Sequence, residues 1–140
     1  MAWAIACFFA LAAATDPVAV LLDQPVTATL AVPEQARHAK VVLLRLEGVL
    51  MRRDAPARWN VFWDMPEATM QTSLDDVHFV GYVASPATSA RRDAKPANFI
   101  LQLPPAALTA LQRQTSIHFT FVPVRKLPEG GVTITSIRLE

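Results

Sequence analysis

The chain of 140 residues has little cysteine, little glycine and no concentration of basic charge. Its one cysteine, Cys7, lies in an apolar N-terminal stretch. No internal disulfide can therefore form, and a zinc knuckle or a Cys-x-x-Cys copper relay is excluded. The formal net charge is +1, and no Lys/Arg cluster is larger than the pairs Arg52-Arg53 and Arg91-Arg92. Nucleic-acid binding needs a basic stripe, so we expect no nucleic-acid partner.

Motifs for catalysis and metal binding are missing as well. The histidines His38, His78 and His118 follow one another at intervals of forty residues, whereas helix-borne copper ligands lie about three or four residues apart. No serine stands in a Gly-x-Ser-x-Gly pattern, and no glycine-rich phosphate loop is present. The sequence therefore predicts no catalytic, cofactor-binding or metal-ligating residue and no enzymatic activity. One alternative stays open, a surface metal site that His78 and His118 would form from neighbouring strands.

Four carboxylates gather in one polar stretch of the chain, 64–76. They are Asp64, Glu67, Asp75 and Asp76. Paired carboxylates can serve acid–base catalysis or bind calcium, but the Asp-x-Asp-x-Asp-Gly pattern of a calcium loop is absent. We predict a solvated acidic loop.

The composition that is present allows a packed core, because 52% of the residues are hydrophobic and 18% are charged. Such a chain is not disordered, and its length suits one domain. The stretch 2–14 carries no charge, but it is too short to span a bilayer, which takes about 20 apolar residues. We expect residues 1–15 to be either a signal-like leader, with small residues at 12–14 before the cleavage point, or the remnant of an interdomain stretch. The protein is secreted or periplasmic if this leader is a signal.

From residue 16 onward the chain alternates apolar and polar residues in short segments, as half-buried strands do. The segments are 26–32, 41–50, 58–64, 77–84, 98–103, 117–121 and 132–139. The polar stretch 34–39 predicts a loop or one helical turn. Two prolines at 104–105 precede a predicted short helix over 106–112. We therefore predict that residues 16–140 form one all-β domain, an antiparallel β-sandwich of about seven to eight strands with one short helix.

Two strands carry features of special interest. In 58–64, Trp59, Val61 and Trp63 share one face and are predicted to lie in the core. Phe62 points the other way, and if it is exposed it is the best candidate for a contact with another domain. The last strand changes parity between Ile134 and 137, which predicts a β-bulge near 135–136.

These strands, taken in order, resemble the C-terminal domain of tyrosinases and plant-type polyphenol oxidases. The motifs that carry the resemblance are Leu44-Arg45-Leu46-Glu47-Gly48-Val49, Arg58-Trp59-Asn60-Val61-Phe62, Asp64-Met65-Pro66-Glu67, Phe79-Val80-Gly81-Tyr82, the strand-plus-short-helix unit Phe99 to Leu111, Phe121-Val122-Pro123 and the ending 132–140. The resemblance covers 18–140. Arg-Trp-Asn stands at 58–60 where the family has Lys-Phe-Asp.

The resemblance implies a non-catalytic accessory domain that covers the copper active site of a tyrosinase-like catalytic domain and keeps the oxidase latent. Its copper belongs to that partner domain, so the resemblance implies no cofactor in this chain. A second interpretation stays open, a free-standing secreted β-sandwich that binds a protein, a sugar or a surface and has no oxidase partner.

Overall fold

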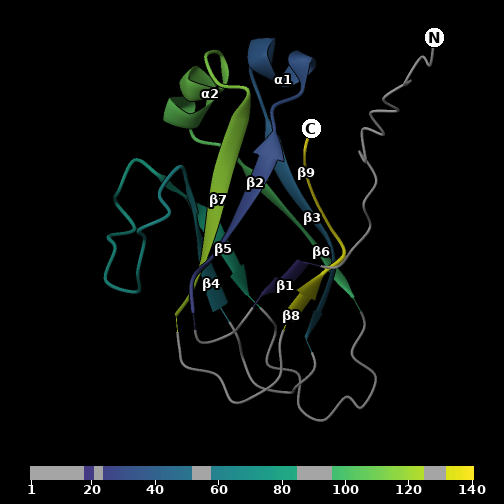
Figure 1. Cartoon of the computed structure of the whole chain (residues 1–140), viewed down its shortest axis with the longest axis vertical. Coiled ribbons are helices and arrows are strands. Elements are labelled where there is room, and N and C mark those ends of the chain that lie inside the picture. Colours follow the sequence, from purple (N-terminus) through teal and green to yellow (C-terminus); the bar gives the residue numbers. More distant parts are fainter. Residues whose placement is uncertain (1–17, 21–23, 52–57, 85–95, 125–131) are drawn as a thin grey trace, which may run out of the picture.

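Two antiparallel β-sheets packed face to face make up the described part of the chain (Figure 1). The computed structural model describes residues 18–20, 24–51, 58–84, 96–124 and 132–140. Their strands are β1 (Val18–Val20), β2 (Val26–Ala31), β3 (Leu43–Met51), β4 (Arg58–Trp63), β5 (Phe79–Ala84), β6 (Ala97–Gln102), β7 (Ser116–Pro123), β8 (Val132–Ile134) and β9 (Ser136–Leu139). The predicted all-β sandwich is confirmed. The leader 1–15 lies outside the described residues.

The seven predicted strands are all present, and two differences from the prediction concern short elements. The short strand β1, which the alternation did not reveal, pairs with β8. Two short helices are found where one was predicted, because the polar stretch 34–39 forms α1 (Glu34–His38) in addition to α2 (Pro105–Leu111). Pro105 stands in the first turn of α2, where its missing N–H costs no hydrogen bond. Both helices lie at the same end of the sandwich (Figure 1).

One sheet has four strands in the order β2-β7-β4-β5, and the other has the order β1-β8-β3-β6 with β9 also paired to β3. The core lies between them. It contains the inward residues of β4, as the alternation predicts: Trp59, Val61 and Trp63 are at most 7% exposed. Leu44 and Leu46 of β3 meet them from the other sheet and are fully buried.

The change of parity near the C-terminus coincides with a bend between β8 and β9 and with an irregular residue on their neighbour β3. Between β8 and β9 the chain bends at Thr135, and on the facing strand Gly48 has a φ of 63°. The Thr135 N–H donates to the Glu47 carbonyl. The strand β3 therefore pairs with β8 and with β9 in one continuous register. The register shifts instead between β3 and β6, where the Gly48 N–H donates to Asn98 Oδ1 at 3.0 Å. The irregularity is near the predicted place, but the register shift itself belongs to β3 against β6.

Candidate interaction face

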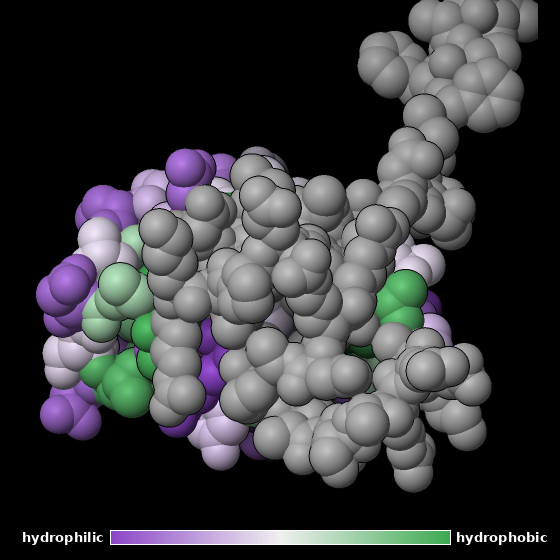
Figure 2. Space-filling view, turned by 90° about the horizontal axis from the view of Figure 1, so that it is seen from below, coloured by the Kyte–Doolittle hydropathy of each residue, from purple (hydrophilic) through white to green (hydrophobic). Residues whose placement is uncertain are grey.

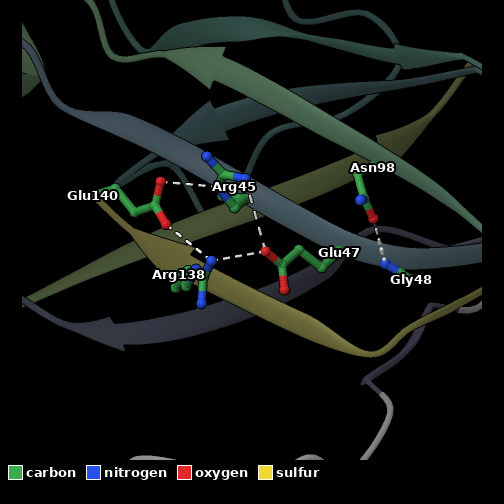
Figure 3. Close-up of polar contacts among 6 residues, drawn as sticks. All are labelled: Arg45, Glu47, Gly48, Asn98, Arg138 and Glu140. Carbon is green, nitrogen blue, oxygen red and sulfur yellow. Dashed lines mark hydrogen bonds and ion pairs between the residues drawn. The ribbon is translucent and has the colours of Figure 1, made fainter.

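The outer face of the five-stranded sheet is neutralised by its own residues (Figure 3). Arg45 and Arg138 stand opposite each other on β3 and β9. Each arginine contacts both Glu47 and Glu140, over N–O distances of 2.8 to 3.9 Å. The four side chains are 29 to 50% exposed. Surface pairs of this kind contribute at most about 1 kcal/mol each, but here they leave no net charge in this cluster to attract a partner.

The outer face of the four-stranded sheet is different, because a second apolar cluster lies on it. Phe62, Val122 and Ala68 are at most 1% exposed there, and Met65 and Phe79 pack against them. The rings of Phe62 and Phe79 are 5.6 Å apart, in a tilted arrangement. Ala68 and Met65 come from the connection between β4 and β5, which folds back over the sheet.

Phe62 therefore lies where its parity predicted, on the side away from the main core, but it is not exposed. Its exposed fraction is 0% because residues of the 64–78 segment cover it. The condition on which Phe62 was a candidate contact residue, that its side chain be exposed, is therefore not met. The sequence predicted a polar loop over 65–76 and no cover for Phe62, because the apolar residues of this stretch follow neither the strand nor the helix period.

The 64–78 segment is held to the sheet by hydrogen bonds at both ends. At the first end, the Asp64 N–H donates to the His118 carbonyl, and the His118 N–H donates to Asp64 Oδ1 at 2.9 Å. Asp64 has a φ of 44°, a left-handed conformation that aspartate tolerates better than most residues. At the other end, Trp63 Nε1 donates to the Val77 carbonyl, and His78 Nδ1 donates to the Trp63 carbonyl at 2.8 Å. The segment is thus a fixed extension of the sheet.

Three large apolar side chains of this segment are exposed to solvent. The exposed fractions are 56% for Met70, 45% for Leu74 and 66% for Val77. Figure 1 shows the segment projecting from the side of the sandwich between β4 and β5. On that side of the molecule, Figure 2 shows hydrophobic residues in green among hydrophilic ones in purple. The exposure of these three residues was not predicted from the sequence, in which Met70 and Leu74 lie in the predicted polar loop and Val77 begins the predicted strand 77–84.

The four predicted loop carboxylates do lie in this segment, in two different roles. Asp64 and Asp76 are half-buried and accept backbone N–H groups, Asp64 from His118 and Asp76 from His78. Glu67 and Asp75 are exposed, as the prediction of a solvated acidic loop requires.

The three histidines do not come together. His38 lies on α1, where it is exposed beside Glu34. His78 stacks on the Trp63 ring at 4.5 Å, whereas His118 lies on the outer face of β7 with its Nδ1 hydrogen-bonded to Thr29 Oγ1 at 2.8 Å. Within the described ranges, no group of three or more His, Cys, Asp or Glu residues could hold a metal ion. These histidines therefore do not fit a copper centre.

None of the described helices is long and apolar enough to cross a membrane.

The geometry thus defines a class of protein domain, an antiparallel β-sandwich with one self-neutralised outer face and one face that carries a projecting, anchored segment. No protein-family model matches the chain, and no curated protein matches it. Solved structures do match it. Latent apple tyrosinase superimposes with a TM-score of 0.66 at 21% identity, over 89% of this chain and 27% of that chain.

Latent aurone synthase, a polyphenol oxidase, has a similar likeness to this chain. The recombinant protein matches with a TM-score of 0.64 at 15% identity, over 87% of this chain and 25% of its own. The protein from its natural source matches with a TM-score of 0.64 at 17% identity, over the same shares. At these identities the likeness shows the fold, and the chain spans about a quarter of the length of these oxidases. The resemblance that the motifs predicted is confirmed at the level of the fold.

Proposed function

We propose that this chain is a non-catalytic accessory domain that covers the active site of a tyrosinase-like phenol oxidase and keeps that enzyme latent. One observation carries the proposal: the same fold occurs in solved structures of two oxidases that are named latent, where it accounts for about a quarter of each chain. The remaining three quarters of those chains have no counterpart here. In this proposal the copper site belongs to that separate portion.

The side chains of the domain support a role without chemistry of its own. The imidazoles of His78 and His118 are hydrogen-bonded to different partners, on different sides of the four-stranded sheet. Copper in type-3 oxidases needs several converging imidazoles. We therefore expect the purified chain to bind copper below one equivalent and to oxidise no phenol, which copper titration and an oxygen-uptake assay would measure.

The decisive experiment combines the chain with an oxidase. The tyrosinase-like oxidase of the same genome is expressed without its own accessory portion, loaded with copper and mixed with increasing amounts of this chain. We expect the rate of diphenol oxidation to fall as the fraction of bound oxidase rises. An unrelated β-sandwich at the same concentration is the control and leaves the rate unchanged.

Other results of these experiments would contradict the proposed function. If the genome encodes no such oxidase, or if the rate stays constant while the chain is folded, the shielding role is refuted. The interpretation as a free-standing binding module then gains support. Phenol oxidation by the isolated, copper-loaded chain would refute the non-catalytic assignment itself.

A further inference from the structure

The 64–78 segment has the properties of a preformed binding surface. It is tied to β7 through Asp64 and to β4 through the Val77 carbonyl and His78. Its backbone also closes on itself in turns, with the Thr72 N–H donating to the Thr69 carbonyl at 3.0 Å. Little conformational entropy is therefore lost when a partner binds there, which favours affinity.

The segment presents three large apolar side chains to solvent. Among the described residues, seven large hydrophobic residues are exposed, and three of them are Met70, Leu74 and Val77. When a partner covers a water-exposed apolar group on a fixed loop, the free energy of the complex is lowered. Methionine adapts its shape to irregular surfaces, which suits a contact that must open and close.

The charge of the segment determines which partners fit. Residues 64–78 contain four Asp or Glu residues and no Lys or Arg, so their formal charge is −4. All thirteen Lys and Arg residues lie elsewhere together with the other eight acidic residues, which leaves +5 on the rest of the chain. Two copies that met through this segment would bring two such acidic loops together, which like-charge repulsion opposes. Anionic lipid and nucleic acid are disfavoured for the same reason.

The outer face of the five-stranded sheet presents one exposed apolar residue, Ile100, beside a cluster of paired charges. On the five-stranded sheet, Arg45, Glu47, Arg138 and Glu140 neutralise one another. A partner that bound there would have to break these ion pairs or cover them without new pairing, and both are costly.

We infer that the 64–78 segment is the surface through which the domain binds the oxidase portion. The receiving face of that oxidase carries Lys or Arg side chains around an apolar depression that accepts Met70, Leu74 and Val77. This inference rests on the proposed function and specifies it, because it assigns the shielding contact to one segment. Long-range attraction between the acidic segment and a basic oxidase face also speeds their association.

The first test removes the apolar contacts and keeps the fold. The triple variant Met70→Ser, Leu74→Ser, Val77→Ser changes only exposed side chains, and the Val77 carbonyl that anchors Trp63 is retained. The matched control is Val41→Ser with Ile100→Ser, which removes apolar side chains that are 53% and 52% exposed outside the segment. Binding to the copper-loaded oxidase portion is measured by calorimetry. We expect Kd to rise at least about tenfold for the triple variant, as for the loss of an interface anchor, and to stay unchanged for the control.

The second test addresses charge. The variant Glu67→Lys with Asp75→Lys should weaken binding at low ionic strength, and the difference from the wild type should shrink at high salt because screening shortens the range of the attraction. Circular dichroism and thermal unfolding establish that each variant is folded.

The outcomes separate this inference from the proposed function. If the wild type inhibits the oxidase and both segment variants bind as the wild type does, the surface assignment is overturned and the shielding role stands. If the control variant loses binding while the triple variant keeps it, the contact lies elsewhere and the assignment is equally wrong. If the wild type does not bind the oxidase portion, the proposed function fails, and this assignment fails with it.

Discussion

Gly48 makes a strong prediction, because an alanine there meets two separate obstacles. Its φ of 63° lies in the left-handed region, where a Cβ atom costs about 1–2 kcal/mol. A Cβ built at this position would overlap Thr135 Oγ1 and lie 2.7 Å from Thr135 Cβ. Relief of that overlap requires a shift of the strand pair and costs about 1–3 kcal/mol. Alanine also lowers the conformational entropy of the unfolded chain, which offsets about 0.4–1 kcal/mol of this destabilisation. We therefore expect Gly48→Ala to lower the free energy of unfolding by about 1–5 kcal/mol.

Urea denaturation followed by tryptophan fluorescence measures this loss, provided that the m-value is unchanged. The control is Gly81→Ala, where φ is not in the left-handed region and the new Cβ would lie 3.2 Å from the flexible Leu101 Cδ2. Its loss should be clearly smaller. A double-mutant cycle with Thr135→Gly isolates the overlap, and we expect a coupling of about 1–3 kcal/mol. Equal losses for the two alanine variants, or a cycle without coupling, would refute the geometric argument.

Two further predictions concern the four-stranded sheet. Asp64→Ala removes both the acceptor for the His118 N–H and a residue that tolerates the left-handed conformation, so it should lower stability by about 1–2 kcal/mol. Asp64→Asn keeps both features, and urea denaturation should show it near the wild type. Phe62→Ala empties a fully buried site and should lower stability by about 3–5 kcal/mol, with Phe62→Leu less affected. An unchanged stability of Phe62→Ala would show that the ring is exposed after all.

The strands were predictable because burial against one opposite sheet imposes a period of two on the sequence. Trp59 and Trp63 illustrate this, since their shared parity placed them correctly in the core. The same rule placed Phe62 on the other face, but parity records only the side of the sheet and not what covers that side. The cover depends on Ala68 and Met65, which come from a segment of successive turns without a regular period.

The candidate surface was harder to predict than the fold. The acidic character of 64–78 is visible in the sequence, whereas the exposure of Met70, Leu74 and Val77 is not. A segment without a regular period has no pattern that tells which apolar side chains face the protein, and here Met65 is half-buried whereas Met70 is exposed. The anchors that fix the segment connect Asp64 with His118, which are 54 positions apart. Contacts over such separations leave no local pattern. The irregularity at the end of the chain was located near the right residues because Ile134 and Leu139 had to reach the same core.

The order of the strands has a consequence for how the domain folds. The strand β2 is paired with β7, and the hydrogen-bonded residues Thr27 and Thr120 are 93 positions apart. The strand β3 is paired with β9, and Arg45 and Glu140 are 95 positions apart. The four-stranded sheet can therefore not be completed on the ribosome before β7 has emerged, nor the five-stranded sheet before β9 has emerged. Closing such long loops is entropically slow, and until β7 is made the strand β2 has no partner strand in its sheet. Loss of the final strand alone should leave a chain that aggregates during synthesis.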